Sequence, residues 1–170
     1  PDLDDATLLR LREQASIQLE SEASPGKPPR FEVRPAEQQA RGLSLLPRPD
    51  HGDVWFDMEG YPNPINGEQL EYLFGACYRD INGEVAFQPW WGHDRAQEKQ
   101  AFFDFISWVE ERRVRHPGLH VYHYASYEKT ALSNLASRHQ IHQARIDEWR
   151  REQLLVDLYP IVRNGLLIGA

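Results

Sequence analysis

Short apolar runs in the middle of the chain predict three consecutive strands. The run DVWFDME (residues 53–59) gives the first strand, LEYLFGACYRD (residues 70–80) the second and EVAFQPWWG (residues 84–92) the third. Asn82-Gly83 lies between the second and third runs, and this dipeptide is a strong signal for a tight hairpin. We therefore expect the second and third strands to be antiparallel neighbours.

Apolar residues at helical spacing predict helices at residues 4–20, 94–115 and 126–138. Asp94 and Gln97 resemble a capping box at the start of the second helix. The apolar faces consist of Leu8, Leu11, Ala15 and Leu19 in the first helix, Phe102, Phe105, Ile106 and Val109 in the second, and Leu132, Leu135 and Ala136 in the third. Each face predicts which side of its helix packs on the rest of the protein.

The order of these elements predicts an α/β fold. A strand meander, a helix, a further strand at LHVYHYA (residues 119–125) and another helix describe a layered domain with a mixed sheet. We expect this domain at residues 51–170. Residues 21–50, rich in proline, are expected to be a linker after a helical segment at residues 1–20.

Composition narrows the possible partners and the compartment. The net charge of −7 weighs against binding nucleic acid by bulk electrostatics, but it suits an enzyme whose acidic site is neutralised by cations. No apolar run approaches membrane-spanning length, so we expect no contact with a membrane. The single cysteine, Cys77, excludes an intramolecular disulfide and is typical of a reducing cytoplasm, where we expect the protein to be located.

Two acids at the end of the first predicted strand are candidate metal ligands. Residues i and i+2 of a strand share a face, so Asp57 and Glu59 point the same way. Mg²⁺ and Mn²⁺ prefer carboxylate oxygens and would neutralise such a pair. In the alternative interpretation, one acid is solvated at the strand tip and the other caps a turn.

A third acid follows the fourth predicted strand. In HVYHYASYEKTAL, Ser126 is expected to cap a helix, which places Glu128 in the first turn of that helix. Glu128 is then either a metal ligand near Asp57 or an acid stabilised by the helix dipole.

Aromatic and basic residues are candidate nucleic-acid contacts. Of Trp90 and Trp91, consecutive on a strand, one should face the core, and Trp91 is a candidate for stacking on a base. The cluster ERRVRH (residues 111–116) either contacts phosphates or compensates the dipole at the end of its helix.

Taken together, FDMEG and HYASYE resemble the DEDD-type exonucleases of the RNase H-like superfamily. Their first motif is D-x-E and their second N-x-x-x-F-D, so that His123, Tyr127 and Glu128 fill the Asn, Phe and Asp positions. The stretches GDVWFDMEG, LEYLFG, HVYHYASYE and LVDLYPIVR are similar to the RNase H-like domain of the bacterial RecB-like nuclease family, over residues 40–170. In that family a RecB-like nuclease region precedes this domain and some members carry a helicase, so residues 1–20 would connect regions.

The resemblance implies a nuclease that hydrolyses DNA or RNA with two Mg²⁺ or Mn²⁺ ions about 4 Å apart. Asp57 would bridge the ions, Glu59 would hold the ion that activates water, and Glu128 would hold the other. His123 and Tyr127 would shape the site or contact the substrate. The resemblance also implies 3′–5′ exonuclease action within a larger nuclease and helicase chain, in DNA repair.

The last motif of the superfamily, a Tyr or His shortly before a final Asp, has no clear counterpart. Asp157 is the late candidate for a fourth metal ligand, although position 153 is Gln and a structural or helix-capping role is the alternative. We expect the last catalytic element to lie beyond Ala170, which would make the domain incomplete here. The absence favours an alternative function, a catalytically inactive RNase H-like module that binds nucleic acid or docks a partner domain.

Overall fold

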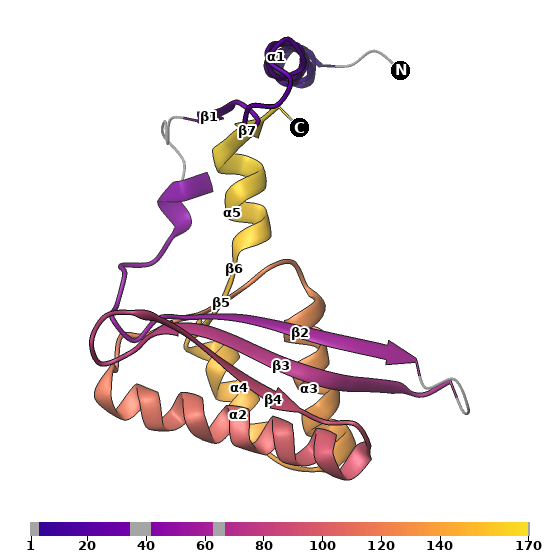
Figure 1. Cartoon of the computed structure of the whole chain (residues 1–170), viewed down its shortest axis with the longest axis vertical. Helices are drawn as coiled ribbons and strands as arrows, with labels where there is room; N and C mark the ends of the chain where they lie inside the picture. Colours follow the sequence, from indigo (N-terminus) through magenta and orange to yellow (C-terminus); the bar gives the residue numbers. More distant parts are fainter. Residues whose placement is uncertain (1–3, 35–41, 63–66, 170) are drawn as a thin grey trace. The chain divides into compact units, whose positions relative to one another are not determined.

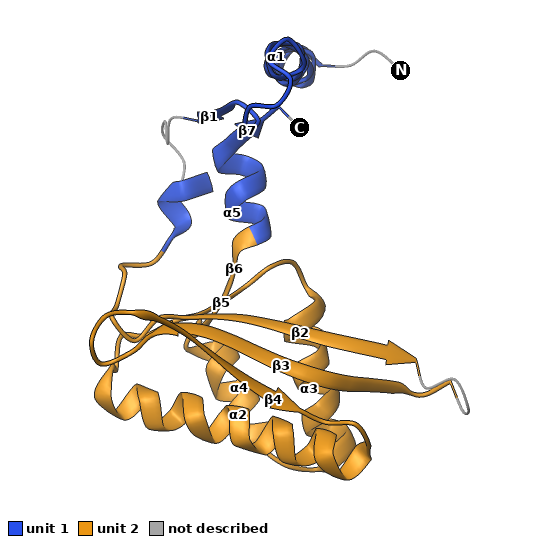
Figure 2. Ribbon diagram, viewed as in Figure 1, with its two compact units in different colours: residues 1–46, 159–170 blue, residues 47–158 orange. Residues whose placement is uncertain are grey.

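The chain folds into two compact units in the computed structural model (Figure 2). The larger unit consists of residues 47–158, and the smaller unit joins residues 1–46 to residues 159–170. The structure describes residues 4–34, 42–62 and 67–169.

A five-stranded mixed sheet forms the larger unit, with the strand order β4-β3-β2-β5-β6 (Figure 1). The predicted antiparallel meander is confirmed, and β5 and β6 extend it as parallel strands. The Asp80 N–H donates to the Glu84 carbonyl at 2.8 Å, and Gly83 takes the positive φ of 82° that the hairpin requires. The strands are β2 (Val54–Pro62), β3 (Gln69–Arg79), β4 (Val85–Trp91), β5 (Val121–His123) and β6 (Leu155–Asp157).

Three helices cover one face of this sheet (Figure 1). Asp94 caps α2 by accepting the Gln97 N–H at 2.9 Å, as predicted. The predicted apolar faces of α2 and α3 are buried, and they form one core with Phe56 and Phe74 from the sheet. Each large apolar side chain that is fully buried in this way contributes about 1.5–3 kcal/mol. The helices are α2 (Arg95–Arg115), α3 (Tyr127–His139) and α4 (Gln143–Arg151).

The turn into α3 differs from the prediction. Ser126 occupies the N-cap position but its side chain makes no capping hydrogen bond, because its backbone is helical (φ −92°, ψ −3°) and not extended. The strand predicted at residues 119–125 is also shorter, since Ala125 has a positive φ of 67° and leaves the extended conformation. The sequence predicts α3 correctly but not the geometry of its first turn.

The smaller unit pairs segments from opposite ends of the sequence. Strands β1 (Phe31–Val33) and β7 (Leu166–Ile168) are antiparallel, and Gln14 of α1 donates to the Ile168 carbonyl at 2.8 Å. The predicted packing face of α1 is wrong: Leu8, Leu11, Ala15 and Leu19 are all exposed, and Ile17 is the buried residue of this helix. The remaining elements are α1 (Asp5–Glu22), the 3₁₀ helix η1 (Gly42–Leu45) and most of α5 (Leu158–Gly165).

The compact units fall at different positions from the segments expected from sequence. The stretch expected as a linker, residues 21–50, contains β1, and residues 159–170 group with the N-terminal segment. Local sequence patterns do not reveal a strand pair this far apart in the chain. Within the described residues, no helix has the length and apolar character needed to cross a membrane.

Candidate active site

Asp57 and Glu59 project from the same face of β2, as the i, i+2 spacing predicts. Val54, Phe56 and Met58 alternate with them and are buried in the core, whereas both acids are exposed. The helices α2 to α4 cover the face that carries the buried residues. The two acids therefore lie on the face of the sheet that these helices leave open.

The turn between β5 and α3 brings Glu128 to these acids. Glu128 lies in the first turn of α3 and is only 4% exposed. Ala125, in its left-handed conformation, donates its N–H to Oδ1 of Asp157 at 2.9 Å, so the end of β6 fixes the turn. His123 donates from Nδ1 to the Ala125 carbonyl at 2.8 Å, and the same nitrogen lies 3.4 Å from Oε2 of Glu128.

The carboxyl groups of Asp57 and Glu128 interact directly. Burial raises the pKa of Asp57, and side-chain contact with Glu128, the charge of Glu128 and the charge of Glu59 raise it further. The Met58 N–H, which donates to Oδ1 of Asp57 at 3.0 Å, acts in the opposite direction. Carboxylates held this close repel each other, so a positive charge between them would be stabilising.

The donor set of this pair fits a hard divalent cation. Oε2 of Glu128 is buried and makes no hydrogen bond to any described residue. A buried carboxylate oxygen in that state is costly unless a cation or a donor satisfies it. Among the residues that the structure describes, however, no group of three or more His, Cys, Asp or Glu side chains is arranged to hold a metal ion. Asp57 and Glu128 are thus in contact, whereas Glu59 acts at longer range.

Tyr127 joins the site to a buried acid that the sequence analysis does not single out. Its hydroxyl donates to Oε2 of Glu71 at 2.8 Å and accepts from Nε2 of Gln69 at 3.2 Å. Burial and the bond to Glu71 raise the pKa of Tyr127 to about 12. A side chain at Gly60 would meet the ends of the Glu71, Gln69 and Tyr127 side chains and would displace this cluster. The sequence feature that could have identified Glu71 is its position as a glutamate within the apolar run LEYLFG.

Aromatic side chains flank the acids on the open face of the sheet. Trp91 pairs with Leu73, which in turn pairs with Glu59, so Trp91 shares the face of the acids and is 53% exposed. Trp90 points the other way and packs on Phe105, which confirms that one tryptophan of the pair faces the core. Trp91 is thus placed where a substrate bound at the acids could reach it.

The fold and the acids define a class of protein. A mixed sheet of a meander plus parallel strands, with carboxylates on adjacent strand ends, is the arrangement that the sequence resemblance implies. The model of the RNase H superfamily matches residues 54–169, more than half of the chain, and the chain belongs to this superfamily. No curated protein and no solved structure gives a significant match. Membership indicates a nuclease-type activity on nucleic acid and the use of divalent metal ions, which is typical of such nucleases.

Proposed function

We propose that the chain is a metal-dependent nuclease domain that hydrolyses phosphodiester bonds of DNA or RNA, as a 3′–5′ exonuclease. The observation that carries the proposal is the contact between Asp57 and Glu128, which come from different elements and meet without a cation among the described residues to separate them. Membership in the RNase H superfamily supports the same reaction.

Three carboxylates would hold the ions. Asp57, Glu59 and Glu128 would be the ligands of Mg²⁺ or Mn²⁺ ions, with Asp57 contributing to both ions of a two-metal site. Bound there, the ions supply Lewis acidity and a water of lowered pKa. The chain supplies position: the burial of Glu128 and its proximity to His123 restrict its carboxylate, and Trp91 on the open face would stack on a base of the substrate.

We also propose that the domain works within a longer chain of the RecB-like nuclease family, which includes nuclease and helicase regions. The support for this context is the similarity of four sequence stretches, among them GDVWFDMEG and HVYHYASYE. A role in DNA repair follows from that context.

Nuclease assays with single-stranded and duplex substrates test the proposal. The wild-type chain should release mononucleotides with Mn²⁺ or Mg²⁺, and Asp57→Asn should reduce the rate at least about 100-fold because it removes a ligand of both ions. The matched control is Asp147→Asn, an exposed acid on α4 that should retain full activity. Calorimetric titration with Mn²⁺ gives an independent readout, since only Asp57→Asn should weaken binding.

A second function, a catalytically inactive module that docks nucleic acid or a partner domain, is favoured by one observation. Asp157, the late candidate ligand, holds the Ala125 N–H instead of standing open at the site. If neither the wild-type chain nor a chain extended beyond Ala170 binds Mn²⁺ or cleaves any substrate, this second function replaces the first.

A further inference from the structure

A cavity of about 580 Å³ lies beside the start of β2, where the β3–β4 hairpin meets the last turn of α2. Its lining includes three arginines, Arg79 from β3 and Arg112 and Arg115 from α2. Trp108 and Ile81 add apolar surface to the same lining. Val54, the first residue of β2, is three residues from Asp57, about 10 Å at the rise of a strand. Trp108, Arg112 and Arg115 come from α2, which covers the other face of the sheet from the acids, and the cavity shares no lining residue with the carboxylate site.

Arg112 is built into the cavity wall as a fixed cation. It is 5% exposed, and its guanidinium donates to the carbonyls of Gly52, His51 and Arg79 at 2.7, 3.1 and 2.8 Å. It also lies over the rings of Tyr78 and Trp108, 4.9 and 5.7 Å from their centroids. Carbonyls and aromatic rings orient the group, but they do not neutralise its charge.

No carboxylate within the described parts of the chain forms an ion pair with Arg112. Buried charges are ordinarily paired, because an isolated charge is costly to remove from water. Nη1 of Arg112 also makes no hydrogen bond to a described residue, which leaves one edge of the guanidinium available to a ligand. Burial and the charge of Arg115 lower the pKa of Arg112 from its usual value, and the charges of Asp50 and Asp53 act in the opposite direction.

The nearby acids are committed to other groups. Asp80, which also lines the cavity, accepts the N–H groups of Asn82 and Glu84 at 2.8 and 2.9 Å and thereby shapes the hairpin. Asp53 accepts the His120 N–H at 2.9 Å, and Asp50 accepts the Gly52 N–H at 2.7 Å and lies 3.5 Å from Nδ1 of His116. The lining of the cavity carries three arginines and one acid, Asp80, so its charge suits an anionic ligand.

Compensation of the helix dipole does not explain this arrangement. Cations in the last turn of a helix are stabilising in general, and this accounts for Arg113, which pairs with Glu110 at 3.0 Å. It does not account for Arg79, which comes from a strand, or for Arg112, whose side chain is buried.

We propose that this cavity binds a nucleotide, with its phosphate held by Arg79, Arg112 and Arg115 and its flat base against Trp108 and Ile81. Guanidinium groups bind phosphate oxygens through paired hydrogen bonds, and a cavity of this volume is in the range of small-molecule sites. The nucleotide is either free or one unit of a nucleic acid strand. The strand source rests on the proposed nuclease function, whereas the free source does not.

Calorimetric titration of the full 170-residue chain at low salt tests the proposal. The probes are inorganic phosphate, adenosine monophosphate and an oligothymidylate of about ten nucleotides, a usual length for a single-strand site. The double variant Arg79→Gln/Arg115→Gln should weaken binding of adenosine monophosphate about tenfold or more, since each lost contact is charge-assisted. The control Arg150→Gln/Arg151→Gln removes the same charge from exposed positions on α4 and its end, and should leave binding unchanged.

Hydrogen exchange on the wild-type chain gives a readout that needs no variant. Adenosine monophosphate should slow exchange in residues 79–84 and 112–116, and should leave α4 unaffected. Asp57→Asn should abolish hydrolysis under the proposed function but retain binding in the cavity, so the two proposals fail separately.

The relative affinities of the probes identify the source of the ligand. Tighter binding of the oligothymidylate than of adenosine monophosphate, lost in Arg79→Gln/Arg115→Gln, identifies a strand; equal or weaker binding identifies a free nucleotide. Absence of binding by both nucleotide probes, binding of inorganic phosphate as tight as that of adenosine monophosphate, or equal weakening by both double variants would overturn the proposal.

Discussion

Asp57 is a candidate metal ligand because of the negative charges that surround it. Taken singly, an acid in D-x-E is as well explained by solvation at a strand tip. Solvation does not explain its contact with Glu128. Oε2 of Glu128 is buried and makes no hydrogen bond to described residues. The sequence predicts that Asp57 and Glu59 share a face, because strand periodicity is local. The approach of Glu128 depends on the left-handed Ala125 and on Asp157, which no local pattern reveals.

The repulsion at Asp57 predicts a pH-dependent stability. Its pKa in the folded protein is raised above 3.8, so the folded state keeps a proton that the unfolded state has lost, and stability falls as pH rises through the folded pKa. Asp57→Asn should therefore be more stable than wild type at neutral pH, by less than about 1 kcal/mol because Asp57 is exposed and its charge is screened.

Urea denaturation at acidic and neutral pH, without divalent ions, measures this difference. Asp147→Asn serves as the control, since Asp147 is exposed on α4 and should show no such dependence. If Asp57→Asn were less stable than wild type at neutral pH, the carboxylates would not be repelling each other.

Loss of the Tyr127 hydroxyl is expected to lower the stability of the protein. Tyr127→Phe removes the donor to Oε2 of Glu71, which is 4% exposed, and should destabilise the protein by about 1–3 kcal/mol, the cost of an unsatisfied buried group. Tyr61→Phe is the matched control, because Tyr61 is 42% exposed and should change stability little. Equal stability of the two variants would mean that water replaces the hydroxyl of Tyr127.

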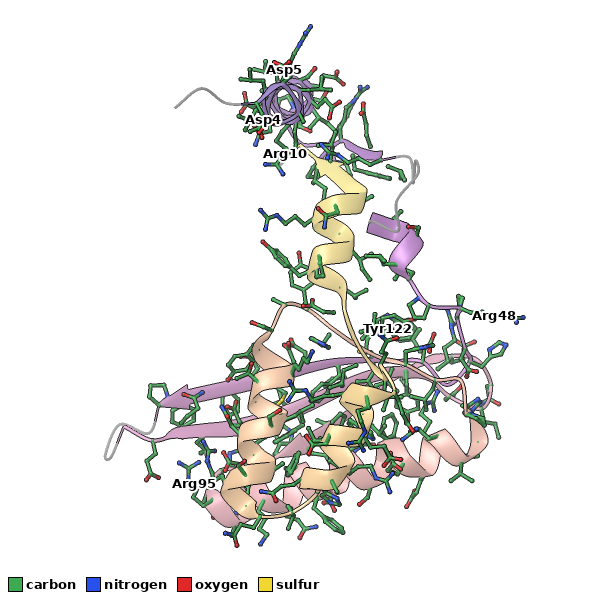
Figure 3. All side chains as sticks on the ribbon, turned by 180° about the vertical axis from the view of Figure 1, so that it is seen from behind. Asp4, Asp5, Arg10, Arg48, Arg95 and Tyr122 are labelled. Carbon is green, nitrogen blue, oxygen red and sulfur yellow. The ribbon has the colours of Figure 1, made fainter. Side chains whose placement is uncertain are left out.

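At the scale of elements, one buried carboxylate joins β3, α2 and α3. Glu98 of α2 is fully buried and accepts the Glu71 N–H at 2.8 Å. Arg138 and His139, at the end of α3, approach its two oxygens at 3.0 and 2.8 Å. Arg95, labelled near the start of α2 in Figure 3, adds a contact at 3.1 Å. Three elements are thus held by one acid that helical spacing places on the apolar face of α2, four residues before Phe102.

Removal of this carboxylate should be strongly destabilising. Glu98→Ala leaves cations and a buried N–H without their acceptor, and the expected loss is about 3–5 kcal/mol of the free energy of unfolding. Glu111→Ala, an exposed glutamate of the same helix, is the control and should cost little. Thermal and chemical unfolding of both variants give the comparison; a loss of less than about 1 kcal/mol in Glu98→Ala would show that the network is solvated.

The sequence predicts elements unevenly, and the reasons are physical. Strands β2 to β4 and helix α2 are confirmed because apolar spacing, the Asn82-Gly83 turn and the Asp94 cap agree with one another. The sequence pattern does not divide the apolar C-terminal segment into elements. It contains β6, α5 and β7 one after another, and each is too short to show a recognisable periodicity.

At the scale of the whole molecule, opposite charges gather at two places along β2. The acids of the candidate active site lie in the middle of the strand, and the arginines of the cavity lie near its start. The net charge of −7 weighs against binding nucleic acid by bulk electrostatics, but it does not reveal that three arginines line one cavity. Any strand bound by the chain would therefore be held by few phosphate contacts and repelled elsewhere.

This division predicts a weak dependence of nucleic acid binding on salt. If Arg79, Arg112 and Arg115 make the phosphate contacts, the logarithm of the binding constant for a single strand should fall with the logarithm of salt concentration with a slope of about −2. Fluorescence anisotropy of a labelled oligothymidylate, titrated between about 50 and 200 mM salt, measures the slope. Arg79→Gln/Arg115→Gln should reduce it to about −1 or less, and Arg150→Gln/Arg151→Gln should not change it. A slope steeper than about −5 would require many more phosphate contacts than the cavity supplies, and would place the main nucleic acid contact elsewhere.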